Sequence, residues 1–257
     1  PPLTIAVAGC GPCGLASALL LQRAGHSVTI FERFEVPEPI GSGLMLQPTG
    51  LSVLGQLGLA RQAIEAGARI ERLIGRAGAE GPLVLDVRYS AARDPGQFGI
   101  GIHRARLFGL LHDKAVADGI AIEAARQVAT TTLLSGNRRR IEFADGASAG
   151  PFDLVVDALG SHSPLLADVP PRDLAYGALW GTVDWVDGTA FDIAALEQRY
   201  NRAARMVGVL PVGTAPGSSQ KKAALFWSLR RDRLANWHDA GLDAWKMEAL
   251  SLWPALR

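Results

Sequence analysis

LTIAVAGCGPCG, residues 3–14, is an apolar run that breaks into the pattern G-x-G-x-x-G and continues into an Ala- and Leu-rich stretch. A second apolar run, SVTIF at residues 27–31, is followed at once by the acidic Glu32. Strand, glycine loop, helix, strand and acid follow one another in the order that a dinucleotide-binding βαβ unit requires. We therefore expect strands over 3–8 and 27–32, and a helix over 14–24 that Gly25 caps.

Each glycine of this loop has its own physical role. Gly9 permits the tight turn off the strand, Gly11 lets the backbone approach a pyrophosphate, and Gly14 lets the helix pack close to the sheet. The helix N-terminus offers unpaired N–H groups to the phosphates. Glu32 is placed to accept hydrogen bonds from a ribose, and its charge disfavours the 2′-phosphate of NADP, which leaves FAD or NAD. A glycine-rich turn in an ordinary βαβ unit is the competing interpretation, but it does not account for the acid.

Both cysteines of the chain lie in this loop, within the string Cys10-Gly11-Pro12-Cys13. The same string occurs in redox sites of the thioredoxin type, and at a helix N-terminus it predicts a lowered thiol pKa. The alternative is that Gly11 and Pro12 belong to the nucleotide loop and that the cysteines are small filling residues. We favour the second interpretation because it explains more residues and because the Trp that flanks the thioredoxin site is absent.

Composition places the chain among globular proteins. Its 257 residues suffice for one large or two small domains, with 48% hydrophobic and 20% charged residues and a formal net charge of +1. Such a balance predicts no capture of nucleic acid or of a membrane surface. The apolar run at 15–21 is too short to span a bilayer, and a strand begins where a signal peptide would stand. With only two cysteines, we expect a cytoplasmic protein without a disulfide scaffold.

Periodicity and turn residues divide the rest of the chain. Helices are expected over 49–57, 60–66 and 104–118, and short antiparallel strands over 70–88. Further strands are expected over 120–123, 127–134 and 138–143, with the basic run Arg138–Arg140 in a solvated hairpin or, less favoured, at a partner contact. The glycine-rich stretch 41–48 is expected to be flexible. The continuous apolar stretch 152–160 predicts a buried parallel strand that returns to the nucleotide sheet.

Beyond residue 171 the pattern changes to longer strands, expected over 178–186, 205–210 and 223–229, which indicate a second domain with an antiparallel sheet. All six tryptophans lie between Trp180 and Trp253, and we interpret them as core and sheet packing in preference to a substrate box. His103, His112 and His162 are not spaced as a metal site, so no metal is expected.

Four segments together resemble the single-component flavin monooxygenases of the para-hydroxybenzoate hydroxylase type. The first is the glycine loop with Glu32 and Arg33, which is similar to the ADP-binding start of that family. The others are similar to its flavin-ring loop, its R-x-x-L-x-x-x-L helix and its D-L-V-V-G-A-D-G-x-x-S turn, and they lie at 41–50, 103–111 and 153–163. The resemblance implies an α/β fold with a Rossmann-like FAD-binding domain, which has a parallel sheet and a β-meander, and an antiparallel-sheet substrate domain. The expected boundaries are 1–69 with 103–172 for the first domain and 70–102 with 173–257 for the second.

The resemblance also implies an activity. FAD would bind in extended form, NADH or NADPH would reduce it, and O2 would then form a C4a-hydroperoxyflavin that hydroxylates a small organic substrate, aromatic in the family. The hard chemistry belongs to the cofactor, so no conventional catalytic residue is assigned. The substrate pocket is expected on the sheet between Trp180 and Leu229. The residues expected to bind the cofactor are Gly9, Gly11, Pro12, Cys13, Gly14, Glu32, Arg33, Gly43, Arg104, Asp157 and Gly160. For Arg33, a plain surface charge is the equal alternative.

Two departures from the family pattern keep other functions open. Leu159 stands where the family has the acid of an Asp-Gly pair, although Asp157 lies two residues earlier. A later Gly-Asp motif of the family has no counterpart before Arg257, so we expect the larger N-terminal part of such an enzyme, as a fragment or a shortened homologue. The alternatives are another FAD- or NAD-dependent oxidoreductase, or a non-catalytic nucleotide-binding fragment. An exposed apolar face would then favour a homo-oligomer or pairing with a missing C-terminal segment.

Overall fold

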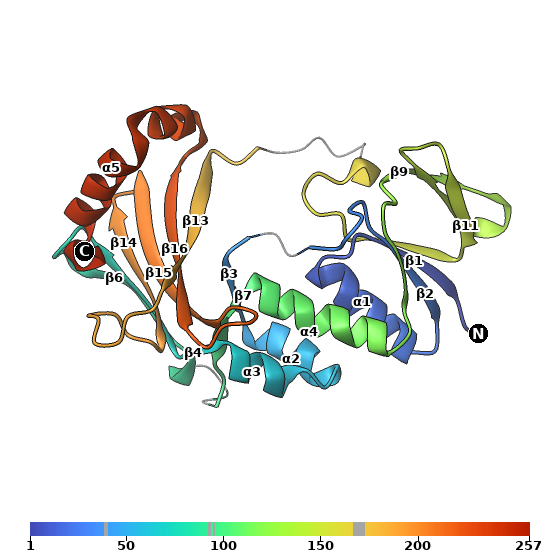
Figure 1. Ribbon diagram of the computed structural model, residues 1–257, viewed down its shortest axis with the longest axis horizontal. Coiled ribbons are helices and arrows are strands. Elements are labelled where there is room, and N and C mark those ends of the chain that lie inside the picture. Colours follow the sequence, from blue (N-terminus) through green and yellow to red (C-terminus); the bar gives the residue numbers. More distant parts are fainter. Residues whose placement is uncertain (39–40, 92–93, 95, 167–172) are drawn as a thin grey trace. The chain divides into compact units, whose positions relative to one another are not determined.

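The computed structural model describes residues 1–38, 41–91, 94, 96–166 and 173–257. The chain forms two compact units, one of Pro1–Ile40 with Leu107–Arg172 and one of Gly41–Arg106 with Asp173–Arg257 (Figure 1). Residues 41–69 and 103–106, which were assigned above to the FAD-binding domain, therefore belong to the second compact unit. The functional boundaries stay a prediction, since compactness does not say what each unit binds.

A four-stranded parallel sheet, in the order β12-β1-β2-β8, forms the centre of the first unit. Strand β1 lies inside this sheet and is buried from Ile5 to Ala8, because α1 packs against the strand and an apolar cluster around Phe31 covers Ala6 and Ala8. Helix α1 packs against β1 and β2 and ends at Arg23. Gly25 follows the C-cap residue Ala24, and its φ of 91° and its bond to the Gln22 carbonyl confirm the expected glycine at the helix end. The bounds are β1 (Thr4–Ala8), α1 (Pro12–Arg23), β2 (Ser27–Phe31), β8 (Ala121–Glu123) and β12 (Leu154–Asp157).

The predicted strand over 152–160 exists and pairs in parallel with β1, but the expectation that it is buried was wrong. Among the described residues, strand β12 lies at the edge of the sheet and pairs with β1. Leu154 is 41% exposed as a result. The apolar stretch indicates a strand, but its place in the strand order depends on pairing with residues distant in sequence, which the stretch does not show.

An antiparallel sheet in the order β11-β10-β9 completes the first unit and matches the expected β-meander. Phe31 of β2 contacts Phe143 and Phe152 of this sheet, with ring centroids 5.2 and 5.8 Å apart, and thereby joins the two sheets through one apolar cluster. The run Arg138–Arg140 lies at the β9–β10 hairpin, as expected. The bounds are β9 (Val128–Leu133), β10 (Arg139–Phe143) and β11 (Ser148–Phe152), and β11 was not predicted.

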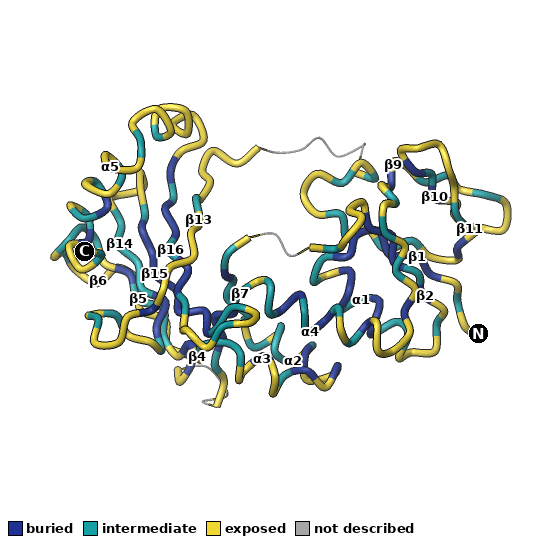
Figure 2. The backbone as a smooth tube through the Cα atoms, viewed as in Figure 1, coloured by how far each residue is buried: buried dark blue, intermediate teal, exposed yellow. Residues whose placement is uncertain are grey.

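The second unit is built on a six-stranded mixed sheet in the order β13-β16-β15-β14-β5-β6. All neighbours are antiparallel except β14 and β5, which run parallel. Figure 2 shows the buried backbone concentrated in β15 and β16, at the centre of this sheet. The bounds are β5 (Arg72–Ala77), β6 (Leu83–Arg88), β13 (Tyr176–Asp184), β14 (Ala195–Asn201), β15 (Arg205–Thr214) and β16 (Lys221–Arg230).

A smaller sheet, β3-β7-β4, contains part of the stretch 41–48 that was expected to be flexible. That expectation was wrong at 43–46, because Gly43 lies beneath Val212 and the strand pairs in register with β7. The remaining bounds are β3 (Gly43–Leu46), α2 (Pro48–Gln56), α3 (Ala60–Ala66), β4 (Ala68–Ile70), β7 (Gly99–His103), α4 (Arg104–Ala117) and α5 (Leu234–Leu252). Short 3-10 helices lie at Tyr89–Ala91, Ser135–Asn137, Pro164–Leu166, Arg231–Arg233 and Pro254–Leu256.

Helix α5 and strand β14 were not predicted. Helix α5 contributes two tryptophans to an apolar cluster that contains most of the tryptophans of the chain. Trp185, Trp227 and Trp253 are buried in one cluster, with Trp237 and Trp245 of the helix packed against it. These five confirm the expectation of core packing, and the mixed α/β architecture confirms the predicted fold class. None of the described helices is long and apolar enough to cross a membrane.

Candidate functional site

In the turn after β1, two glycines lie directly against carbonyl groups of the main chain. Gly9 adopts a φ of 103°, and a Cβ there would lie 2.6 Å from the carbonyl oxygen of Ala158. A Cβ on Gly14 would lie 2.0 Å from the carbonyl oxygen of Gly9. Both distances are far below contact, so the strand, the turn and the helix approach one another only because these side chains are absent.

Gly11 differs from its two neighbours in this loop. It is the N-cap of α1, with φ of −73° and ψ of 175°, a conformation open to any residue. A Cβ at Gly11 would meet no atom within 4 Å. Nothing in the fold of the described chain therefore requires glycine at this position. The space beside it adjoins the first turn of α1, where unpaired N–H groups favour an anion.

Glu32 follows β2 at the same edge of the sheet and is 8% exposed. Its Oε2 accepts a hydrogen bond from the Cys10 N–H at 2.8 Å, and its Oε1 accepts one from the Phe34 N–H at 3.1 Å. The carboxylate therefore ties the glycine loop to the end of β2. Each oxygen keeps a further lone pair, so the group can still accept bonds from vicinal hydroxyls.

The two cysteines of the loop lie in different environments. Burial and the neighbouring Glu32 carboxylate raise the pKa of the Cys10 thiol to about 12. The lowered pKa that a thioredoxin-type interpretation predicts is therefore wrong for Cys10. Cys13, the second residue of α1, is exposed, and both thiols are free. The loop chemistry favours the nucleotide interpretation over dithiol redox chemistry.

We expect iodoacetamide at pH 8 to modify Cys13 and to leave Cys10 unmodified in the folded chain. A thiol with a pKa of about 12 holds roughly one part in ten thousand as reactive thiolate at that pH, and Cys10 is also buried. Peptide mass spectrometry over a time course measures both sites. Cys10 should react once the chain is unfolded in urea, which serves as the control. Equal rates at the two cysteines in the folded chain would contradict this assignment.

A third loop, at the end of β12, lies beside the same sheet edge, since the Ala158 N–H donates to the Ala8 carbonyl. Asp157 organises this loop: its Oδ1 accepts from the Leu159 N–H at 3.0 Å and its Oδ2 accepts from the Ser163 hydroxyl at 2.6 Å. Gly160 has a φ of 85°, which suits the turn. Leu159, in place of the family acid, packs against the apolar cluster of the first unit.

Three further residues were expected to bind the cofactor, one in the first unit and two in the second. Arg33 is exposed, with its guanidinium carbon 4.6 Å from the Phe34 ring centroid. In the second unit, Arg104 begins α4, and its side chain lies against Gly41, where a Cβ would come within 2.9 Å of it. Gly43 has a packing reason, since a Cβ there would lie 2.4 Å from Cγ1 of Val212. Their roles toward a cofactor stay predictions.

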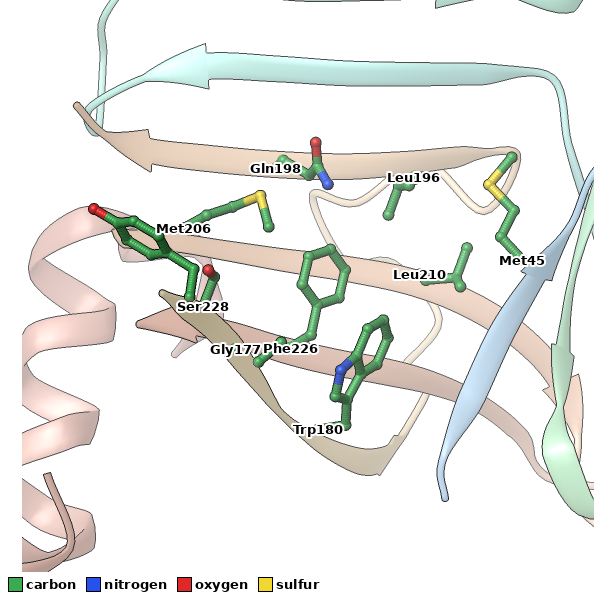
Figure 3. Close-up of a pocket in the computed structure, with 11 residues that line it drawn as sticks. Met45, Gly177, Trp180, Leu196, Gln198, Met206, Leu210, Phe226 and Ser228 are labelled. Carbon is green, nitrogen blue, oxygen red and sulfur yellow. The ribbon is translucent and has the colours of Figure 1, made fainter. Parts of the chain in front are cut away.

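The second unit also contains a cavity of about 340 Å³ on the six-stranded sheet (Figure 3). Trp180 stacks on Phe226 with ring centroids 4.7 Å apart and planes at 28°, and Trp180 is 49% exposed. Trp180 therefore shows the sheet packing that was expected, but it is not buried in the core, because it stands on the edge strand β13. The other lining residues are Met45, Tyr176, Gly177, Ala178, Leu196, Gln198, Met206, Leu210 and Ser228.

The cavity overlaps the stretch from Trp180 to Leu229 on which a pocket was expected, but no motif in the sequence singles out the lining residues Gln198 and Met206. Gln198 of β14 pairs with Gly208 of β15, and Met206 of β15 pairs with Tyr200 of β14. One sequence feature that relates to Gln198 is the pair of glycines at 75 and 208, which lie opposite it on the two neighbouring strands. Such a pattern is visible only when the strand register is known.

A parallel sheet with a glycine turn, an open helix N-terminus and a buried acid at one edge defines a dinucleotide-binding unit of the flavoprotein type. The chain belongs to the FAD-binding domain family, whose profile matches residues 3–152. This finding confirms the resemblance that the four sequence segments indicated.

Relatives with known activities are similar to this chain over part of their length. It is 32% identical over 187 residues to 3-amino-4-hydroxybenzoate 2-monooxygenase of Streptomyces cremeus, across 70% of this chain and 46% of that protein. It is 28% identical over 228 residues to the aurachin C monooxygenase/isomerase of Stigmatella aurantiaca, across 82% and 54%. The chain thus spans about half the length of these curated relatives.

The fold of almost the whole chain is shared with a solved structure. The tetrameric form of 2-methyl-3-hydroxypyridine-5-carboxylic acid oxygenase superposes with a TM-score of 0.78 at 18% identity, covering 99% of this chain and 65% of that one. At this identity the likeness concerns the fold. It extends over both compact units, and so it includes the mixed sheet as well as the nucleotide loop.

Proposed function

We propose that this chain is the FAD- and substrate-binding part of a flavin-dependent monooxygenase that hydroxylates a small aromatic compound at the expense of NADH or NADPH. The observation that carries the proposal is the Gly9–Gly14 turn with Gly11 open and Glu32 buried beside it. The relatives named for oxidising an aminohydroxybenzoate and an aurachin support the reaction class.

The residues of the first unit fit the ADP half of FAD. The space beside Gly11, which a side chain would fill, adjoins the N-terminus of α1 and suits a pyrophosphate. Glu32 keeps acceptor capacity for ribose hydroxyls while it holds the loop. Gly9 and Gly14 would keep the helix close enough to the sheet for these amides to converge.

When bound, FAD supplies hydride acceptance and oxygen activation, and the chain's own residues supply position and a dry environment. The Gly9–Gly14 loop would hold the phosphates, and Glu32 would orient the ribose. Arg104 and Gly43 are proposed to lie toward the flavin, as the family resemblance implies. On the second unit, the stacked Trp180 and Phe226 would orient an aromatic ring and exclude water from one side of it.

The test is the visible spectrum of the purified chain after addition of FAD and gel filtration. We expect a flavin band that elutes with the protein, followed by NADH or NADPH oxidation that an aromatic substrate stimulates. Retained flavin without stimulated oxidation would favour a non-catalytic nucleotide-binding protein. Flavin that separates from a folded chain would remove the basis of the proposal.

Replacing Glu32 with Ala should weaken FAD binding about tenfold or more, since hydrogen bonds to a charged acceptor contribute about 1.5–3 kcal/mol. Fluorescence titration of FAD measures the change. Glu35→Ala is the matched control, because Glu35 is an exposed acid three residues further along. Unchanged affinity in Glu32→Ala would mean that the adenosine end is misplaced.

We also propose a location and an oligomeric state for the protein. The two free cysteines fit a reducing compartment such as the cytoplasm. The tetrameric form of a structural neighbour fits a homo-oligomer. Size-exclusion chromatography with light scattering measures the oligomeric state of the chain directly.

A further inference from the structure

Two glycines in the mixed sheet leave room for two aromatic rings on either side of Gln198. Gln198 of β14 lies opposite Gly208 of β15 and opposite Gly75 of β5. A Cβ on Gly208 would lie 1.9 Å from Cζ of Phe226, and a Cβ on Gly75 would lie 2.4 Å from Cε2 of Tyr200. The ring of Phe226 therefore lies on one bare backbone and the ring of Tyr200 on the other. The Gln198 side chain stands between them.

Tyr200 determines which end of the Gln198 amide is free. Its hydroxyl donates a hydrogen bond to Oε1 of Gln198. Burial raises the pKa of Tyr200, so the phenol stays protonated and remains a donor through neutral and mildly alkaline pH. The amide oxygen is therefore occupied, and the amide nitrogen has no acceptor among the described residues. Figure 3 shows this nitrogen on the side of the amide that faces Leu196 and Phe226.

The rest of the described lining of the cavity is uncharged. Its polar side chains are Tyr176, Gln198 and Ser228, and the others are aromatic, aliphatic or thioether groups. An ionised carboxylate that enters such a site loses hydration without gaining a cation, which is strongly unfavourable. A neutral carbonyl oxygen or ring nitrogen, in contrast, gains the amide N–H. The stacked pair of Trp180 and Phe226 suits a flat ring.

We infer that this cavity binds an uncharged, planar aromatic or heteroaromatic compound with a hydrogen-bond acceptor that Gln198 receives through Nε2. That this ligand is the substrate rests on the proposed function, because the ligand is the compound that is hydroxylated only if the chain is part of a monooxygenase. Tyr200 is the positioning residue, since it acts through the Gln198 amide. The approach of Phe226 to Gly208 shapes the floor of the cavity.

Three probes of similar size separate charge from acceptor strength. They are 4-hydroxybenzamide, which is neutral and has a carbonyl acceptor, 4-hydroxybenzoate, which is anionic, and 4-ethylphenol, which is neutral and lacks the carbonyl. Ligand-observed NMR titration of the full chain at pH 7.5 gives a Kd for each. We expect the amide to bind about tenfold more tightly than the benzoate, and about three- to tenfold more tightly than the ethylphenol. Binding of the benzoate that equals or exceeds binding of the amide would overturn the inference.

Variants test the role of Gln198 itself. Gln198→Leu should equalise the affinities for 4-hydroxybenzamide and 4-ethylphenol, because it removes the donor and retains the apolar stem. Gln62→Leu, at an exposed position of α3, is the control for the same change outside the cavity and should keep the preference. Tyr200→Phe removes one hydroxyl and should reduce the preference in part, because the amide is then free to turn. A preference that survives in Gln198→Leu would contradict the assignment.

FAD retention, measured in the same samples, separates this inference from the proposed function. A chain that retains FAD and oxidises NAD(P)H but prefers the benzoate refutes the ligand class and leaves the monooxygenase proposal intact. A chain that prefers the amide but neither retains FAD nor oxidises NAD(P)H refutes the monooxygenase proposal, and the ligand class of the cavity stands.

Discussion

Gly11→Val should abolish FAD retention and leave the stability of the chain without cofactor nearly unchanged. The space beside Gly11 is empty to 4 Å, and its backbone angles suit a β-branched residue, so the fold has no reason to resist the substitution. The new side chain would occupy the place where a pyrophosphate meets the first turn of α1. We expect FAD affinity to fall by about 100-fold or more, which corresponds to ~2.7 kcal/mol.

Two measurements on the same variant separate binding from folding. The apo-chain should melt within about 4 °C of the parent, since replacing glycine by valine at an N-cap without a side-chain hydrogen bond costs about 1 kcal/mol or less. The flavin band should be lost on gel filtration. Gly55→Val is the control, because a Cβ at Gly55 also meets nothing within 4 Å and the residue lies in α2, outside the loop. Full retention of FAD in Gly11→Val would mean that no phosphate passes over this loop.

Gly14→Ala should destabilise the chain by about 3 kcal/mol or more, whether or not FAD is present. The added Cβ would lie 2.0 Å from the Gly9 carbonyl oxygen and 3.3 Å from Cβ of Ala158. The nearer neighbour is main chain at the end of β1, so it cannot turn away as a flexible side chain would. Overpacking of this kind usually costs about 1–3 kcal/mol, and a backbone obstacle places this case at or above the upper end. Urea unfolding of the apo-chain measures it.

The same substitution in another helix should have the opposite sign. Gly109 lies in α4, and a Cβ there would meet nothing within 4 Å. Gly109→Ala should stabilise the chain by about 0.5–1 kcal/mol, because alanine loses less backbone freedom in a helix. If both variants shifted the urea midpoint in the same direction, the contact between Gly14 and Gly9 would not be the cause.

Sequence reasoning was most successful where residues act over short distances along the chain. The first strand, the glycine turn, the first helix and its Gly25 cap follow from neighbouring residues, and each was found close to its predicted bounds. The same holds for α3 and α4, whose apolar spacing indicates a helix directly. Helix α5 was missed because Gly241, with a φ of 79°, interrupts the helical pattern.

Charge and burial within the site could not be predicted from the same patterns. The Cys-x-x-Cys string suggested a lowered thiol pKa, whereas Cys10 is buried beside Glu32 and its pKa is raised to about 12. The role of Asp157 toward a cofactor stays a prediction, and its part in organising the loop from Leu159 to Ser163 is visible only in the structure. In each case the environment of the side chain depends on a residue distant in sequence or on a backbone group. A short sequence motif contains no information about either.

The class of this protein can be inferred from one short segment, because phosphate binding by a βαβ unit depends on glycines and an acid at set spacings along the chain. The lining of the cavity in the second unit, in contrast, follows from how the strands pair in the folded sheet. Gly75, Gln198 and Gly208 become neighbours through strand pairing, since register across a sheet brings together residues that no periodicity connects. The orientation of the Gln198 amide then depends on one hydroxyl, that of Tyr200, which the folded sheet holds in place.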